Sequence, residues 1–146
     1  MINKLIEIIG REAELFETFL ELLETQKEML VKNDLEGINR VTESQREKLV
    51  ESQLLNKQRL QVIEQIKNDR NIEGDLNVTR LLDIVDQEQA DRLNKLQNLI
   101  LSLNNKITES RNQNAMLLNR SREYILKTME MLSRVNRPET SYTPAG

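Results

Sequence analysis

The sequence predicts an all-α protein, an elongated antiparallel helical bundle or coiled coil of three long helices, the last of which can kink into a fourth segment. Apolar residues recur every seven positions from Val78 to Val135 without proline or glycine. A repeat of this period specifies helices that supercoil around neighbours. The chain has only two Phe and two Tyr, so its core consists of Leu, Ile, Val and Met. Four glycines and two prolines supply too few turns for a sheet protein.

The composition predicts one soluble domain, residues 1–137, followed by a flexible tail, residues 138–146. The chain has 146 residues, 31% of them charged, and a mean hydropathy of −0.59. The best candidate for a membrane span, Leu99 to Leu103, is far shorter than the roughly 20 residues that a membrane helix needs. The first helix carries several glutamates, which excludes a signal peptide. We therefore expect a cytoplasmic protein without membrane insertion.

The residue types exclude several kinds of chemistry. Cysteine, histidine and tryptophan are absent, which removes disulfides, thiolate nucleophiles, zinc sites built on Cys or His, and His-based triads. No spacing brings carboxylates or lysines together in a pocket. We expect no catalytic residue, no metal and no cofactor.

Charge is unevenly distributed along the chain. Residues 1–51 hold 7 basic and 12 acidic groups, whereas residues 104–146 hold 7 basic and 4 acidic groups. The basic excess has no interleaved aromatic residues, so it is typical of a solvated helix face and no nucleic acid partner is expected. An acidic protein partner suits it better.

The first helix is predicted over about residues 2–31. Its apolar residues fall on two adjacent seven-residue lines, a stripe wide enough to touch two neighbours. The helix ends at Lys32-Asn33-Asp34, where Asn33 can cap the second helix and Glu36 can return a hydrogen bond.

The second helix is predicted over about residues 35–69 and is more polar. Its narrow apolar stripe buries one face only, and its alternating charges describe a solvated face. Residues 68–77 form the next loop, because asparagine, aspartate and Gly74 cluster there. Asn77 or Thr79 can cap the next helix.

The last helix is predicted over residues 78–135, packed against the first two. Because it is longer than the second helix, it runs out of neighbours near Gln113. The segment beyond is more apolar, and an exposed patch of that size needs a cover. The main line of this helix contains Leu82, Asp86, Gln89, Leu93, Leu96, Ile100, Leu103, Ile107, Ser110, Asn114, Leu117, Ser121, Tyr124, Thr128, Met131 and Val135.

Three kinds of contact could cover the apolar face of the segment from Asn114 to Val135. The helix can kink near Asn104-Asn105 or residues 112–114 and fold back as a fourth helix. It can pair with a second copy of the chain, or it can dock an amphipathic segment of another protein. Pro138 ends the helix.

Particular residues resemble the FlgN-like flagellar export chaperones, which serve the hook-associated proteins that join hook to filament. The resemblance lies in Leu30 to Leu35 at the first turn, with a charged second helix up to Arg59. It is stronger in the block Asn112 to Tyr124 and in the tail from Thr140 to Gly146, which bears Tyr142. The tail after Tyr142 is shorter than in the family.

The resemblance implies a type III secretion chaperone that binds the C-terminal helical region of its clients, prevents their premature assembly and delivers them to the export apparatus. It also implies that the C-terminal part of the chaperone carries client binding. The positions that match the family are Asn114, Leu117, Leu118, Ser121 and Tyr124. Our own extension along the same face adds Ile125, Thr128, Met131, Leu132 and Val135.

We expect these residues to hold an amphipathic client helix, with Leu117, Leu118, Tyr124 and Met131 as anchors. Asn114 and Ser121 either hydrogen-bond the client or belong to a helix interface that stays wet. The alternative function is a structural homodimeric coiled coil without an export client. We expect a monomer or a weak homodimer.

Overall fold

The structure is a computed structural model that describes residues 1–136, with side chains described as far as Arg134. The described residues form four helices and no strand: α1 (Ile2–Lys32), α2 (Leu35–Arg70), α3 (Val78–Leu82) and α4 (Gln87–Asn136). The predicted all-α class is confirmed. The predicted tail, residues 138–146, lies outside the described residues.

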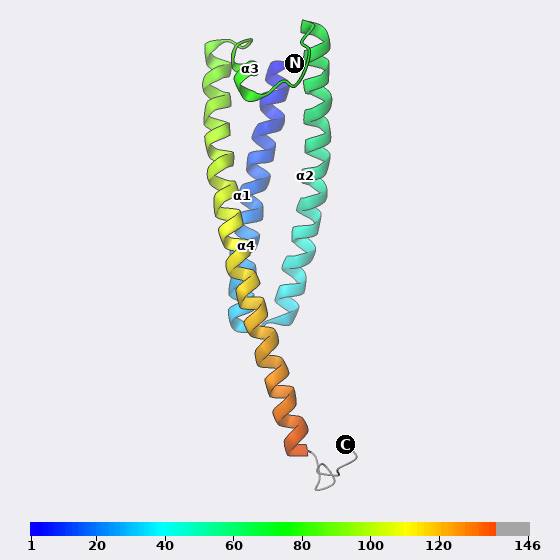
Figure 1. Ribbon diagram of the computed structural model, residues 1–146, viewed down its shortest axis with the longest axis vertical. Coiled ribbons are helices and arrows are strands. Elements are labelled where there is room, and N and C mark those ends of the chain that lie inside the picture. The colour runs from blue at the N-terminus through cyan, green and yellow to red at the C-terminus, as the bar shows by residue number, and fades with distance from the viewer. Residues whose placement is uncertain (137–146) are drawn as a thin grey trace.

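Helix α1 is the central helix of the bundle. Both α2 and α4 pack along it, and they do not pack along each other. Figure 1 shows them on either side of α1, with α2 returning the chain and α4 running parallel to α1. The wide stripe of α1 therefore covers two neighbours, as predicted.

The prediction that the last helix packs against both preceding helices holds at the core near α3, where Leu93 of α4 shares a buried cluster with Val62 and Ile66 of α2. Elsewhere the close contacts of α4 are chiefly with α1. The physical reason is the narrow apolar stripe of α2. Only four residues of α2 are buried, against nine of α1. Most of this buried face of α2 packs against α1, so little apolar surface of α2 remains for contact with α4.

Local side-chain chemistry sets the turn between α1 and α2. Asn33 ends α1 in the left-handed conformation, with φ at 54°, a common way for a helix to stop. The residue that caps α2 is Asp34 and not Asn33 as predicted, because Asp34 Oδ1 accepts a hydrogen bond from the Gly37 N–H at 3.0 Å. A Cβ at Gly37 would collide with Met29 Sδ and lie 2.6 Å from Asp34 Oδ2. A side chain at this position would therefore displace Met29 or disturb the Asp34 cap.

The predicted continuous helix 78–135 is interrupted between Leu82 and Gln87. Asp86 and Gln89 form a reciprocal capping box: Asp86 Oδ1 accepts from the Gln89 N–H at 2.8 Å, and Gln89 Oε1 accepts from the Asp86 N–H at 3.1 Å. This arrangement starts a new helix. Asn77 caps α3, as predicted. From Gln87 onward α4 is uninterrupted, so neither predicted kink occurs.

The main apolar core lies at the end of the bundle where α3 and the start of α1 meet. It combines residues of all four helices, of which Leu5, Ile6 and Ile66 are the most completely buried. Toward the other end, the α1–α4 contact continues through Leu103 and Ile107 and then becomes polar.

Candidate functional site

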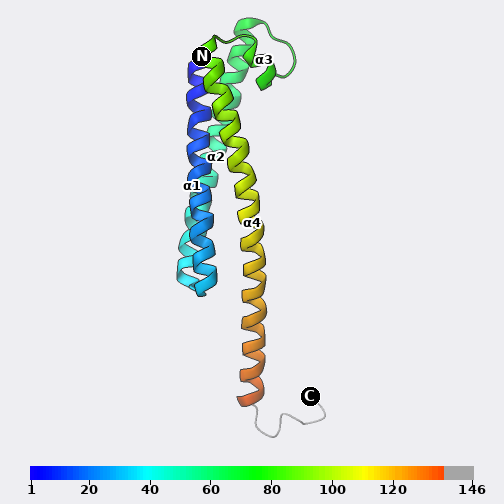
Figure 2. The same cartoon turned by 90° about the vertical axis from the view of Figure 1, so that its left-hand side faces the viewer.

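The last part of α4 extends beyond the rest of the bundle. In Figures 1 and 2 it projects past the turn between α1 and α2. The final hydrogen bond to that turn joins Ser121 Oγ to Asn33 Oδ1 at 3.0 Å. We call residues 122–136 the arm. Its length is about 22 Å at the usual helical rise.

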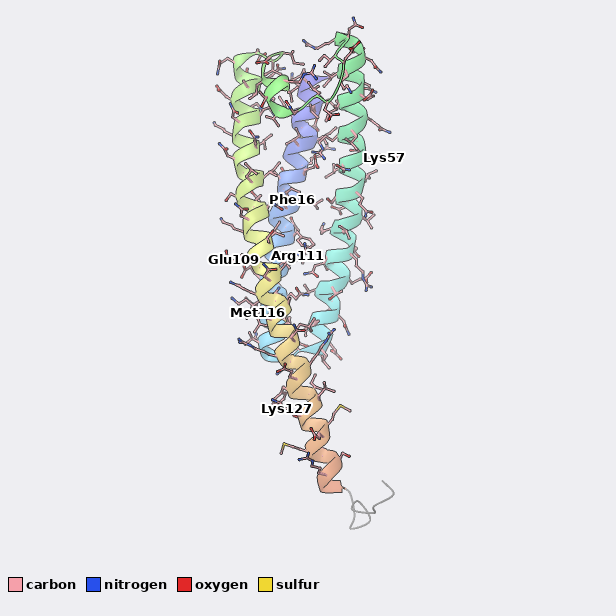
Figure 3. All side chains as sticks on the ribbon, in the orientation of Figure 1. Phe16, Lys57, Glu109, Arg111, Met116 and Lys127 are labelled. Atoms are coloured by element: carbon pink, nitrogen blue, oxygen red, sulfur yellow. The ribbon has the colours of Figure 1, made fainter. Side chains whose placement is uncertain are left out.

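The arm exposes apolar side chains, as Figure 3 shows around the lower part of α4. No hydrogen bond or ion pair among the described residues joins it to another helix. Large exposed apolar patches typically mark binding sites. The exposed apolar residues of the arm are Tyr124, Ile125, Leu126, Met129, Met131 and Leu132.

Just before the arm, the core line of α4 turns polar where it contacts α1. Ser110 Oγ donates to Glu24 Oε1 at 3.2 Å. Asn114 is only 4% exposed, and its Nδ2 donates to the Leu23 carbonyl and to Gln26 Oε1, both at 2.9 Å. The Oδ1 atom of Asn114 is buried without a partner. Asparagine here is therefore held by α1 through its nitrogen, while its oxygen is unused.

The ten predicted site residues fall into two groups. Asn114, Leu117 and Ser121 are turned toward α1 and its end, with Asn114 buried and the other two half-buried. Thr128 is half-buried as well. The exposed group consists of Leu118, Tyr124, Ile125, Met131 and Leu132. Val135 lies in α4, but its side chain is outside the described side chains.

Sequence reasoning missed three exposed apolar residues of this region, Met116, Leu126 and Met129. They lie off the main line of the last helix and off the adjacent line through Leu118, Ile125 and Leu132, from which the predicted site was built. The length of the last helix could have revealed them. A helix that extends beyond its neighbours exposes apolar residues on all its faces, and not only on one.

The arm itself carries charges of both signs. Arg134 and Glu130 form an exposed ion pair with an N–O distance of 2.6 Å, and such pairs contribute little stability. Among the described residues, no group of three His, Cys, Asp or Glu could hold a metal ion.

One carboxyl group in the bundle has a perturbed pKa. Burial raises the pKa of Glu12 above its usual value, and the nearby Arg59 guanidinium partly opposes this shift. Arg59 Nε lies 3.3 Å from Glu12 Oε1. This pair joins α1 to α2 and lies far from the arm.

The fold and this surface define the structural class of the protein. It is an all-α protein in which two long helices pack on a central one and the last helix projects an apolar arm. The family model of the FlgN protein matches residues 1–146, and the chain belongs to this family. No curated protein and no solved structure matches it. Membership supports a flagellar export chaperone in general terms, and this family is one of chaperones and not of enzymes. Within residues 1–136, no helix has the length and apolar character that crossing a membrane requires.

Proposed function

We propose that the protein is a cytoplasmic type III export chaperone of the flagellum. It binds the C-terminal helical region of hook-associated proteins, prevents their premature assembly and delivers them to the export apparatus. The class of function follows from the family. The observation that carries the finer proposal is the arm, a formed helix whose apolar residues are exposed in the part of the chain that the structure describes.

An amphipathic client helix is the natural cover for this arm. Two helices that pack side by side bury apolar stripes three and four residues apart. Burying one Leu, Ile or Met side chain contributes roughly 1.5 to 3 kcal/mol. Four or five such side chains therefore contribute roughly 6 to 15 kcal/mol, against an association cost of about 4 to 15 kcal/mol. Useful affinity thus requires that the client cover most of the arm.

We assign different roles to the proposed site residues according to the exposure of their side chains. Leu118, Tyr124, Ile125, Met131 and Leu132 are exposed and serve as client contacts. Val135 continues their register.

The remaining site residues act through the position of α4. Asn114 and Ser121 hold α4 against α1 and its terminal turn. Leu117 and Thr128 are half-buried and lie between the two groups.

The test replaces Ile125 and Leu132 by aspartate together. Residues that anchor a helix typically contribute 2 kcal/mol or more, so the double variant should bind a C-terminal fragment of a hook-associated protein at least about 30-fold more weakly. Isothermal titration calorimetry measures the affinity, and far-UV circular dichroism checks that helicity is unchanged. The matched control is Val50→Asp with Leu60→Asp, since these α2 residues are similarly exposed, at 65% and 55%. Equal affinity for both double variants would refute the assignment.

A second function is supported by the seven-residue repeat of the arm, which suits pairing with its own copy. In this alternative the protein is a structural homodimer without a client. Light scattering distinguishes the two: a stable dimer that disappears on deletion of residues 114–146, combined with no binding of the client fragment, supports the homodimer.

A further inference from the structure

A groove runs along one side of α1, between α2 and α4. Two cavities of about 580 and 340 Å³ follow one another there. Because α2 and α4 do not pack along each other, they leave the groove between them, and Val78 and Leu81 of α3 also line the larger cavity. We use "the groove" for both cavities together. Phe16 marks its middle in Figure 3.

The floor of the groove is one continuous face of α1. The α1 residues that line the two cavities follow one another at spacings of three and four, so they form a single helical stripe. From Ile9 to Leu30 this stripe is about 32 Å long, the length of a helix of about 20 residues. The α1 residues are Ile9, Glu12, Phe16, Phe19, Leu23, Gln26 and Leu30.

One wall of the groove exposes apolar surface to solvent. Leu101 of α4 lines the larger cavity and is 56% exposed. Leu118 lines the smaller one and is exposed as well. A narrow trough with an apolar floor and an apolar wall fits an amphipathic helix laid along it.

Two buried polar atoms without hydrogen bonds belong to residues that line this groove. They are Asn114 Oδ1, an acceptor, and Arg59 Nε, a donor. Arg59 Nε forms an ion pair with Glu12 but no hydrogen bond. Buried polar groups in native proteins are nearly always bonded. Both atoms are enclosed by the protein itself, so a helix that lies in the groove reaches neither of them, and they do not select the occupant.

The charges of the groove select the occupant. Its charged side chains are Glu12, Arg59 and Arg111. Glu12 and Arg59 form an ion pair, whereas Arg111 forms none with a described residue. Figure 3 shows Arg111 on the side of α4 that faces α2, and Glu109 on the other side. The groove thus has a positive excess, which favours an acidic partner.

The arm of the chain fits poorly in this groove. It is shorter, about 22 Å against about 32 Å. It carries three basic and two acidic side chains, so a second copy would place like charges beside Arg111. Folding back within one chain would break α4, which is continuous past Ser121.

We propose that the groove is a second docking site, for a single amphipathic helix of about 20 residues from another protein. The apolar face of that helix lies on α1, and its carboxylates lie beside Arg111. This surface is distinct from the arm in its position and charge. The groove shares only Asn114 and Leu118 with the proposed client-binding residues.

The test uses two designed 20-residue helical peptides as probes, with identical apolar residues and either glutamates or lysines beside them. Fluorescence anisotropy measures their binding to the full chain. The acidic peptide should bind at least about tenfold more tightly than the basic one. Equal binding of the two peptides would overturn the proposal.

Variants on α4 locate the binding. Leu101→Asp should weaken the acidic peptide at least about tenfold, whereas Leu99→Asp, an exposed leucine on α4 outside both cavities, should not. Arg111→Glu should reverse the preference between the peptides, whereas Arg92→Glu, which lines a cavity on another side of α1, should leave it unchanged. Equal effects within each pair would refute the site.

Two further measurements identify a wrong occupant. Tighter peptide binding after deletion of residues 122–146 would assign the groove to the chain's own arm. A dimer that Leu101→Asp dissociates would assign it to a second copy. The Ile125→Asp, Leu132→Asp variant should bind the acidic peptide as tightly as the parent chain, so failure at the arm and failure at the groove give different results.

The absence of cysteine from the chain provides a readout that does not depend on weakened binding. An environment-sensitive fluorophore on Gln97→Cys, which lines the groove, should respond to the acidic peptide. The same label on Lys95→Cys, which lines the cavity on another side of α1, should not. Equal responses at both positions would place the peptide elsewhere.

Discussion

Replacement of Asn114 by aspartate tests the polar contact that holds α4 to α1. The side chain is almost fully buried, and its Nδ2 donates to the Leu23 carbonyl and to Gln26 Oε1, both at 2.9 Å. Aspartate has nearly the same shape but no N–H group. The substitution therefore removes both donated hydrogen bonds and directs a carboxylate at two oxygen atoms.

The magnitude follows from these contacts. Two lost hydrogen bonds cost about 2 kcal/mol, and unpaired buried oxygens cost about 1 to 3 kcal/mol more, so we expect a loss of about 3 to 5 kcal/mol near pH 7. Burial raises the pKa of the new carboxyl above its unfolded value of about 3.9. The protonated acid can donate one bond, so the native state binds more protons than the unfolded state. The stability of Asn114→Asp should then fall as the pH rises from about 4 through the folded pKa.

Urea unfolding followed by far-UV circular dichroism, at several pH values between 4 and 8, measures these effects. Asn114→Leu is the matched control. It loses the same two bonds but places no carboxylate there and also removes the unpaired Oδ1, so near pH 7 it should lose about 1 to 3 kcal/mol less stability than Asn114→Asp. Equal losses for the two variants would show that the lost hydrogen bonds, and not the buried carboxylate, set the cost. A loss for Asn114→Asp that is independent of pH would refute the buried-charge reasoning.

Two further predictions concern the bundle. Because burial raises the pKa of Glu12, the native state holds this proton more tightly than the unfolded state, so the parent chain should lose stability relative to Glu12→Gln as the pH rises from about 4.5. Urea unfolding of both proteins at pH 4 and 7 checks the sign, and a parent chain that gains stability relative to Glu12→Gln between these pH values would contradict it. Loss of the α4 cap in Asp86→Ala should cost about 1 kcal/mol, whereas Asp83→Ala, which removes no side-chain hydrogen bond, should be nearly neutral in the same assay.

The bounds of α1 and α2 could be predicted because their signals are local. The predicted ranges 2–31 and 35–69 differ by one residue at each C-terminal end from Ile2–Lys32 and Leu35–Arg70. Both helices end at an asparagine in the left-handed conformation, Asn33 and Asn71. Asparagine tolerates this conformation better than most residues do, so a single residue specifies where each helix ends.

The break before α4 was missed although its signal was present. Asp86 and Gln89 occupy positions on the predicted apolar line, and were interpreted as polar interruptions of a long repeat. An aspartate with a glutamine three residues later is also the pattern of a capping box. The periodicity of the surrounding leucines outweighed it. Ser110 and Asn114 are also consecutive polar residues on this core line, but α4 continues through them, so it is the capping-box pattern and not polarity alone that marks the boundary at Asp86.

The close packing of α4 on α1 could not be predicted, since an apolar stripe does not specify which helix it contacts. A stripe on α4 fits any exposed stripe of similar width, and the order α1, α2, α4 along the chain favours α2 by proximity. In the structure α4 packs chiefly on α1, because most of the buried face of α2 is already in contact with α1. That choice leaves the groove open, so neither the groove nor its charge could be derived from periodicity.

The polar residues on the core line of α4 connect register to the length of the arm. A seven-residue repeat also permits α4 to slide by one repeat along α1 without losing its apolar contacts, a shift of about 10 Å. Such a slide would leave Asn114 without its bonds to Leu23 and Gln26 and would separate Ser121 from Asn33. Buried polar positions in coiled coils fix register in this way, at some cost in stability. The same contacts therefore set how far the arm projects, because a slide by one repeat would withdraw about half of its 15 residues into the bundle or expose as many more.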